Sequence, residues 1–354
     1  MEAQRFTIAD VARLAGVSKG TVSFALNGRG GVAAETRERI LAAARELGWQ
    51  PNHRARSLSV SRAFAVGLVV ARPAELLGAD PFFPAFIAGV ETVLSPAGQS
   101  LLLQVVPPGE AEAAGYRTFA TEGRVDGVFL TDLRSADRRI ALLEELGLAA
   151  VTLNRPDIAS SFPAVCADDR PGVTQAVAHL VDLGHVRIGY VSGPQDFIHS
   201  GSRREAWAAA MRDAGLAAGP LVVADFTAAG GAAATAHLLD LPERPTAIVY
   251  ANDVMAIAGM GVAHNRGLRV PRELSVVGFD GIELGSHVHP PLTTVTTDPF
   301  GWGRVAAETL MRVIDPATQG AVDDVELAPA RLQVRGSTAK PATRRARRAV
   351  PETP

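Results

Sequence analysis

The chain has 354 residues, of which 47% are hydrophobic, and this is long enough for two or three domains with a sizeable buried core. Its charge is unevenly spread, because residues 1–62 carry ten Lys or Arg and five Asp or Glu while the whole chain has a net charge of −2. A basic segment on an acidic body favours a nucleic-acid-binding arm joined to a sensor body, and it argues against a uniformly basic protein.

Cysteine content and hydropathy exclude several further classes. Cys166 is the only cysteine, so the chain has no intrachain disulfide, and a reducing cytoplasm fits. The sequence has no Cys/His cluster at ligand spacing, and we therefore expect neither a zinc site nor a cofactor. The opening residues MEAQR do not resemble a signal peptide, and the apolar run at 63–71 is too short for a membrane span. We expect a cytoplasmic protein with no membrane partner.

The segment 7–27 predicts two short helices joined by a tight turn. Apolar residues at positions 8, 11, 12 and 15 form one buried helix face, Gly16 ends that helix, and Ser18 caps the next one. The outward face of the second helix carries polar or small residues, which suit phosphate and base-edge contacts in a major groove. By itself the pattern also fits an ordinary α-hairpin with a solvated face.

The residues that follow strengthen the interpretation as a DNA-binding module. A third amphipathic helix is expected at 36–47, where Ala33 and Ala34 stand in place of a capping side chain and Gly48 ends the helix. The segment 53–59 is too short and polar to be a stable helix alone, which is typical of a segment that folds when bound. Leu58, among basic residues, could wedge into a minor groove or, alternatively, pack as a linker leucine on the next domain.

The run from 7 to 59 resembles the DNA-binding headpiece and hinge helix of the LacI/GalR family of bacterial transcription regulators. The matching pieces are IADVA at 8–12, AGVS at 15–18, TVS at 21–23, LN at 26–27, TRERI at 36–40, LGWQPN at 47–52 and ARSL at 55–58. The resemblance implies a homodimer whose headpieces read a palindromic double-stranded operator, with each Leu58 inserted in the central minor groove. The implied DNA-contacting residues are Thr7, Ser18, Lys19, Gly20, Thr21, Ser23, Phe24, Asn27, Arg54, Arg56 and Leu58.

Two positions of the second helix depart from the family pattern. Phe24 stands where the family most often has arginine, and Gly20 stands where a base-reading side chain is usual. Of the three positions that normally read base edges, only Lys19 keeps a hydrogen-bonding group. Phe24 either contacts a thymine methyl group or packs against the headpiece, so the operator sequence stays open.

From residue 62 onward, buried strands alternate with amphipathic helices, which predicts an α/β body with two lobes and parallel sheets. Ligands of such sheets bind beyond the carboxyl ends of the strands, so the cleft between the lobes is the expected site. Strands are expected at 66–71, 101–106, 127–131, 151–154, 188–192, 247–251 and 276–279, and helices at 86–94, 173–183 and 203–214.

The same section resembles the family's effector domain, which is similar to periplasmic sugar-binding proteins. The matching motifs are PFF at 81–83, GRVDG at 123–127, LGHVRI at 183–188, Arg203 with AW at 206–207, NDVMA at 252–256 and PLTTV at 291–295. Within this resemblance, Arg203 and Asp253 match positions that commonly hold the effector, and Phe83 and Phe226 match aromatic residues of the cleft. Strand ends add Asn154, Asp168, Asn252 and Asp280, although Asp280 could instead cap backbone amides. Phe82 is expected at a turn or a contact between the lobes.

The fold class we expect is an all-α helix-turn-helix headpiece followed by a two-lobed, periplasmic-binding-protein-like α/β domain. The expected boundaries are a headpiece at 1–50, a hinge at 51–62, an effector-binding and dimerisation domain at 63–338, and a disordered basic tail at 339–354. The expected function is a transcription regulator, and specifically a repressor, whose operator affinity changes when a small sugar-like effector binds between the lobes.

Three alternatives differ in ligand or in class. One is a regulator that senses a nucleoside or nucleobase corepressor, since phenylalanines also suit a flat ring. Another is a sugar-binding transport protein, which would need an export signal and has no use for a headpiece. An α/β enzyme would need a catalytic set, and the sequence has no Walker loop. The neighbouring carboxylates Asp168 and Asp169 precede a helix and suit a cap better than an acid/base pair.

Overall fold

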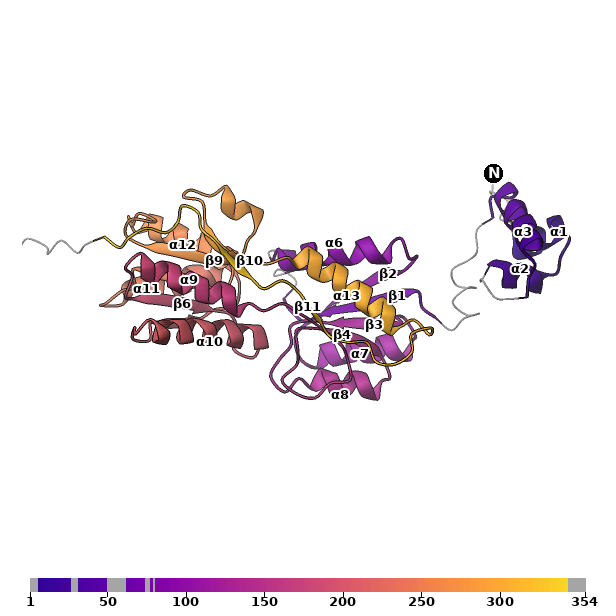
Figure 1. Ribbon diagram of the computed structural model, residues 1–354, viewed down its shortest axis with the longest axis horizontal. Coiled ribbons are helices and arrows are strands. Elements are labelled where there is room, and N and C mark those ends of the chain that lie inside the picture. The colour runs from indigo at the N-terminus through magenta and orange to yellow at the C-terminus, as the bar shows by residue number, and fades with distance from the viewer. Residues whose placement is uncertain (1–5, 27–30, 50–61, 74–76, 79, 343–354) are drawn as a thin grey trace, which may run out of the picture. The chain divides into compact units, whose positions relative to one another are not determined.

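The computed structural model describes residues 6–26, 31–49, 62–73, 77–78 and 80–342, and the chain divides into two compact units, Met1–Phe64 and Ala65–Pro354 (Figure 1). The small unit contains α1 (Ile8–Leu14), α2 (Lys19–Leu26) and α3 (Ala34–Glu46). The larger unit contains two six-stranded sheets with helices packed on them. We take the two units separately.

The three helices of the small unit enclose a core of small and β-branched side chains. Small residues allow short helices to approach closely, and Arg39 ties α3 to the end of α1 because its Nε donates to the Ala15 carbonyl at 3.0 Å. The buried members of this core are Val11, Ala12, Ala15, Val22, Ala25, Ile40, Ala43 and Ala44.

The helix ends of the small unit follow the expected capping chemistry. Gly16 ends α1 with a left-handed φ of 64°, and the Ser18 hydroxyl accepts a hydrogen bond from the Thr21 N–H at 3.1 Å at the start of α2. Ala33 occupies the N-cap of α3 and makes no side-chain cap hydrogen bond. The third helix starts two residues earlier than expected, at Ala34 rather than Thr36.

The first lobe of the larger unit is a parallel sheet with the strand order β11-β5-β4-β3-β1-β2. Its strands are β1 (Ala65–Val70), β2 (Ser100–Val105), β3 (Gly127–Leu130), β4 (Ala149–Leu153), β5 (Ala164–Cys166) and β11 (Val325–Glu326). Helices α6 (Phe82–Leu94) and α13 (Pro299–Val313) cover one face, and α7 (Glu110–Thr121) and α8 (Arg138–Glu145) cover the other (Figure 1).

Strand β1 shows why this sheet is apolar on both faces. Val66, Leu68 and Val70 pack in the cluster that contains α6 and α13, whereas Val69 packs in the cluster that contains α7 and α8. Since successive strand side chains point to opposite faces, a sheet with helices on both sides needs a continuous apolar run. This run is the signal that predicted the strand.

The second lobe repeats this plan with the strand order β12-β10-β9-β8-β6-β7. Its strands are β6 (Ile188–Ser192), β7 (Leu221–Val223), β8 (Ala247–Tyr250), β9 (Ser275–Asp280), β10 (Thr293–Thr296) and β12 (Arg331–Gln333). Its helices are α9 (Arg170–Asp182), α10 (Ile198–Asp213), α11 (Ala228–Asp240) and α12 (Asp253–Asn265), with the 3-10 turn η1 at Glu283–Ser286. All strand pairs are parallel except β10 with β12.

The chain crosses between the lobes several times, so each lobe contains distant segments of sequence. Helix α13 returns from the second lobe to pack beside α6, and a glycine on each helix permits the contact. A Cβ on Gly89 would lie 1.9 Å from the Phe300 carbonyl oxygen, and one on Gly303 would lie 2.0 Å from the Phe86 carbonyl oxygen. No larger residue fits at this crossing without moving a helix.

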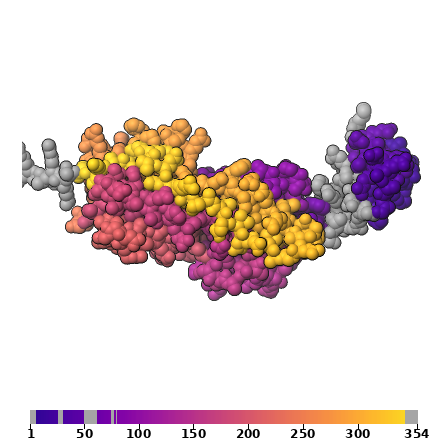
Figure 2. Space-filling model, in the orientation of Figure 1, coloured from indigo at the N-terminus to yellow at the C-terminus, as the bar shows by residue number. Residues whose placement is uncertain are grey.

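The C-terminal segment runs along the outside of both lobes, as the yellow atoms in Figure 2 show. It adds β11 to the first sheet and β12 to the second. Beyond β12, the Ala339 N–H donates to the Ser275 hydroxyl at 3.1 Å, and the Ala339 carbonyl lies 2.9 Å from His185 Nε2. The backbone therefore still packs on the second lobe at 339, where we expected the tail to begin; residues 343–354 of that tail lie outside the described part.

The expected fold class, an all-α headpiece followed by a two-lobed α/β domain with parallel sheets, is confirmed. Three helices of the larger unit begin earlier than predicted, namely α6, α9 and α10. In the part of the chain that the structure describes, no helix is long and apolar enough to span a bilayer.

Candidate functional site

The outward face of α2 is where the sequence places DNA contacts. The Ser18, Lys19, Gly20 and Phe24 positions are exposed, and Thr21 and Ser23 are half-buried. Phe24 is 46% exposed, so this ring is not a core residue of the headpiece. An exposed ring beside hydroxyls, a lysine and a glycine fits an apolar contact next to phosphate contacts.

Thr7 and the hinge residues need separate treatment. The Thr7 N–H and hydroxyl both donate to the Asp10 carboxylate, at 2.9 and 2.8 Å. In the structure Thr7 is therefore the N-cap residue of α1. The remaining expected DNA contacts, namely Asn27, Arg54, Arg56 and Leu58, lie outside the described residues.

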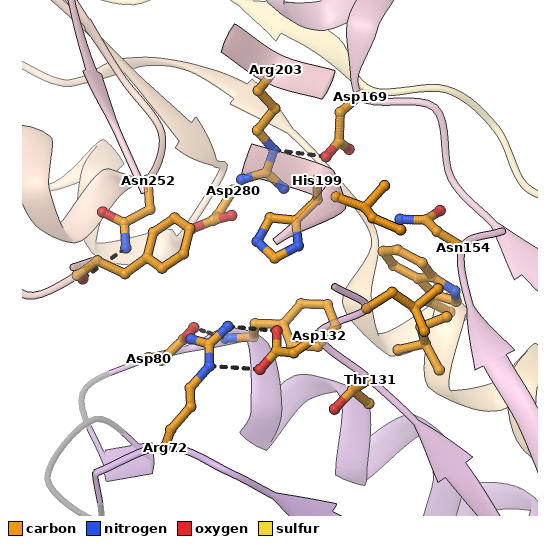
Figure 3. A pocket seen from close by; sticks show the side chains of 16 residues that line it. Arg72, Asp80, Thr131, Asp132, Asn154, Asp169, His199, Arg203, Asn252 and Asp280 are labelled. Atoms are coloured by element: carbon orange, nitrogen blue, oxygen red, sulfur yellow. Dashed lines mark hydrogen bonds and ion pairs between the residues drawn. The ribbon is translucent and has the colours of Figure 1, made fainter. Parts of the chain in front are cut away.

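A cavity of about 80 Å³ lies between the lobes of the larger unit, and we call it the inner pocket (Figure 3). Most of its polar residues follow or end parallel strands, where the carboxyl ends of the two sheets face each other. The first lobe contributes Arg72, Asp80, Thr131, Asp132 and Asn154, the chain crossing contributes Asp169, and the second lobe contributes His199, Arg203, Phe226, Asn252 and Asp280.

On the first-lobe side, Arg72 is clamped between two carboxylates. Its Nε and Nη2 donate to the two Asp132 oxygens at 2.7 and 2.6 Å, and its Nη1 donates to Asp80 at 2.8 Å. Burial alone would raise the pKa of Asp132, but the Arg72 guanidinium brings that pKa below its usual value. Burial raises the pKa of Asp80, with Arg72 opposing it. Asp132 is therefore a fixed anion beside the cavity.

On the second-lobe side, Arg203 has acidic neighbours but leaves some of their oxygens free. Its Nε donates to Asp169 Oδ2 at 2.7 Å and its Nη1 to the Ala251 carbonyl at 2.9 Å. The buried Asp169 Oδ1 has no hydrogen-bond partner among the described residues. Burial raises the pKa of Asp280 well above its usual value, although the nearby Arg203 charge lowers it. Both carboxyl groups can accept hydrogen bonds from a ligand hydroxyl.

Three aromatic rings lie beside these charges. His199 stacks on Phe226 with ring centroids 5.7 Å apart, and it also stacks on Phe197 with ring centroids 5.4 Å apart. Burial lowers the pKa of His199 to about 3, assisted by the positive charge of Arg203, so the ring is neutral at physiological pH. Phe82 and Trp302 also line the inner pocket from the first lobe.

Asp253 differs from the expectation that it contacts the effector. Its side chain is fully buried, Oδ2 accepts the Gly281 and Ile282 N–H groups at 2.9 Å each, and Oδ1 accepts the Thr294 hydroxyl at 2.6 Å. It is not among the residues that line the inner pocket. Asp253 therefore performs the backbone-capping role that was the alternative for Asp280, while Asp280 faces the cavity.

For two further expected effector residues, Asp168 and Phe83, the adjacent residue in the sequence lines the pocket instead. Asp168 is bound to Arg170, with 2.8 Å between Asp168 Oδ1 and Arg170 Nε, and its neighbour Asp169 lines the pocket instead. Phe83 is buried in the core of the first lobe at 1% exposure, and its neighbour Phe82 lines the pocket. In both pairs, adjacent side chains point in different directions, and the sequence motif does not say which one turns inward.

The structure brings together five of the expected residues, namely Asn154, Arg203, Phe226, Asn252 and Asp280. Sequence analysis missed Arg72, Asp132 and His199. Arg72 and Asp132 had a usable signal, since each follows a predicted strand directly; His199 had none, because it lies in the first turn of α10, before the predicted helix start. Asn252 lines the pocket and also starts α12, since its Oδ1 accepts the Met255 N–H at 2.9 Å.

Comparison with known families agrees with both units. Residues 7–52 match the family described as bacterial regulatory proteins, lacI family, and residues 177–338 match the periplasmic binding protein-like domain. Among the described residues, no group of three or more His, Cys, Asp or Glu side chains could hold a metal ion.

Relatives and solved structures cover nearly the whole chain. The HTH-type transcriptional regulator CelR of Thermobifida fusca is 35% identical over 331 residues, which cover 92% of this chain and 95% of that protein. The HTH-type transcriptional repressor CytR of Escherichia coli (strain K12) is 31% identical over 94% of this chain and 96% of that protein.

Among solved structures, a CelR–cellobiose complex matches with a TM-score of 0.72 and 32% identity, covering 94% of this chain and all of that chain. The lac repressor dimer bound to operator and the anti-inducer ONPF matches with a TM-score of 0.81 and 27% identity, covering 95% of this chain and all of that chain. The chain therefore belongs to the LacI family of bacterial transcription regulators, and it is a DNA-binding regulator rather than an enzyme or a transport protein.

Proposed function

We propose that this regulator is a repressor that senses a sugar in the inner pocket and binds a palindromic operator as a homodimer in the cytoplasm. The observation that carries the sugar proposal is the set of unfilled acceptors beside fixed cations. Asp169 Oδ1 is buried without a partner, the Asp280 carboxyl group faces the same cavity, and Arg203 lies between them. Such a set recognises neighbouring hydroxyls, which donate to the carboxylates and accept from the guanidinium.

The aromatic rings favour a sugar over a nucleobase. A flat base would need an open slot between two ring faces, but His199 is already stacked with Phe197 and with Phe226. A sugar needs only one apolar ring face for its C–H surface, and it needs many hydrogen-bonding groups. The CelR relative was solved with cellobiose, which agrees with this chemistry.

The proposed coupling to DNA follows from the position of the pocket. An effector that contacts both lobes stabilises the arrangement of lobes that it fits, and operator affinity changes by as much as the effector distinguishes the arrangements. The DNA contacts are proposed for the exposed face of α2 and for the hinge, with Leu58 of each hinge as the wedge. The lac repressor, solved as a dimer on its operator, supports the dimer and the two half-sites.

The test combines sugar binding with DNA binding on the full chain. We would screen monosaccharides and disaccharides by calorimetry and then measure the affinity for a labelled operator with and without the best sugar. Arg203→Lys should weaken sugar binding by about tenfold or more because the forked guanidinium is lost. Arg204→Ala, the adjacent arginine that does not line the pocket, is the matched control and should bind as the parent does. A protein that binds nucleosides but no sugar would contradict the proposal.

A further inference from the structure

A second cavity lies beside the inner pocket, and we call it the outer groove. It has a volume of about 660 Å³ and is lined by both lobes, including Pro73, Pro108 and Arg134 from the first lobe and Pro194, Asp196 and Asp225 from the second. The inner pocket, at about 80 Å³, holds roughly five to eight water-sized volumes of 10–15 Å³, which suits one sugar ring. A ligand with two rings would therefore need space outside it.

The two cavities share a thin wall. Arg72 and Phe226 line both of them, and the Arg72 guanidinium lies 5.5 Å from the Phe226 ring centroid and 5.5 Å from that of Phe197. The far end of the Phe226 ring rests on Gly193, where a Cβ would lie only 2.0 Å from the ring. These two side chains separate the cavities, so a ligand that fills both must displace Phe226 or Arg72.

The outer groove has the chemistry of a sugar subsite. Its prolines and the Phe197 ring offer an apolar surface for the C–H face of a pyranose. Asp196 is 60% exposed at the side chain, and together with Asp225 and Arg134 it offers acceptors and a donor at the rim. This mixture of an apolar floor and a few convergent polar groups is typical of a built ligand site.

The groove also lies where the lobes are bonded to each other. The Ile198 N–H donates to the Leu133 carbonyl at 2.9 Å, and the Ser135 N–H donates to the Asp196 carbonyl at 3.2 Å. Arg134 reaches towards Asp196 at 3.7 Å and is held at 2.9 Å by Glu112, a carboxylate that is only 3% exposed. A ring in the outer groove would rest on these contacts and stabilise the closed arrangement of the lobes.

We propose that the effector is an oligosaccharide of at least two rings, with one ring in the inner pocket and the next in the outer groove. This inference rests on the proposed sugar-sensing function and adds the size of the ligand. The second ring contacts the Phe197 and proline surface and the Asp196 carboxylate, and it bridges the two lobes.

The experiment measures binding to the full chain by calorimetry with glucose, galactose, cellobiose, maltose and lactose as probes. We expect one disaccharide to bind about tenfold or more tightly than any of the monosaccharides. Asp196→Trp places an indole in the groove and should weaken the disaccharide by about tenfold while leaving monosaccharide binding within about twofold. Asp196→Asn keeps the shape of the side chain and is the matched control, with disaccharide binding within about threefold of the parent.

The outcomes separate this inference from the function on which it rests. If a monosaccharide binds as tightly as the best disaccharide, or if Asp196→Trp leaves disaccharide binding unchanged, the outer groove is not a subsite, although sugar sensing stands. If none of the sugars binds, the proposed function falls and the oligosaccharide proposal falls with it. The comparison of monosaccharides with disaccharides on the parent chain needs no variant, so misfolding of Asp196→Trp would not block the test.

Discussion

Asp253 is expected from the sequence to contact the effector, whereas in the structure it accepts hydrogen bonds from the backbone, and a substitution can distinguish the two roles. In Asp253→Ala, the Gly281 and Ile282 N–H groups lose a buried acceptor, at about 1–3 kcal/mol each, while the Thr294 hydroxyl can turn to the Val295 carbonyl at 3.3 Å. We therefore expect a loss of about 4 kcal/mol in the free energy of unfolding, a large fraction of the stability of a typical domain.

Asp253→Asn should behave differently because the amide can keep the three hydrogen bonds that the carboxylate makes. The amide oxygen can accept the two N–H groups that now bond to Oδ2, and the amide nitrogen can donate to the Thr294 hydroxyl, so we expect a loss of less than about 1 kcal/mol. Gly278 must stay glycine, since a Cβ there would lie 2.0 Å from Asp253 Oδ1.

The pH dependence of the stability of Asp253→Asn, compared with that of the parent, provides a second readout. Burial raises the pKa of Asp253 to about 6 against three hydrogen bonds that lower it. A carboxyl group whose folded pKa is raised loses stability as the pH rises from about 4 to about 6. The difference between Asp253→Asn and the parent should therefore move in favour of Asn over that window.

Denaturant unfolding of both variants, followed by sugar titration, is the measurement. If Asp253→Ala unfolds at nearly the same denaturant concentration as the parent and loses only sugar binding, then Asp253 contacts the effector and the structural argument is wrong.

The remaining predictions concern one residue each. Asp280→Asn should leave stability at pH 8 equal or higher, because it removes a buried carboxyl group whose pKa is raised, and calorimetry should show about tenfold weaker sugar binding. His199 has its pKa lowered to about 3, so protonation favours the unfolded chain as the pH falls below 6.5; at pH 5.5 the parent should lose about 1 kcal/mol relative to His199→Gln in thermal unfolding, and equal pH profiles would contradict this. Ala33→Ser should raise headpiece stability by about 1 kcal/mol by supplying the missing N-cap, and unchanged headpiece unfolding would refute it.

The sequence predicted the headpiece well because short-range chemistry determines it. The turn at Gly16, the cap by Ser18 and the missing cap at Ala33 each depend on residues within four positions, and the structure shows all three. The α/β body was also predictable, since buried parallel strands such as β1 give continuous apolar runs.

The sequence predicted that a pocket lies between the lobes, but it did not predict every residue that lines it. The local direction of the backbone decides which side chains face the cavity. The neighbours Asp168 and Asp169 offer the same chemistry to a sequence reader, yet only Asp169 turns towards Arg203. Likewise, Asp253 lies three residues after β8 and Asp280 is the last residue of β9, and the hydrogen bonds from the Gly281 and Ile282 N–H groups to Asp253 distinguish the two carboxyl groups. Such choices depend on contacts between residues far apart in the sequence.

A feature of the backbone explains why these choices are fixed in the folded protein. Asp132, Asn154, Phe226 and Asp280 line the inner pocket with left-handed φ values of 51°, 72°, 67° and 112°. A non-glycine residue in such a region costs about 1–3 kcal/mol and persists only where the surrounding structure holds it. Since each of these residues lies at or near the end of a strand, the two sheets supply that constraint. That constraint holds the Asp132, Asn154 and Asp280 side chains towards the cavity before any ligand arrives, so the effector does not have to order them when it binds.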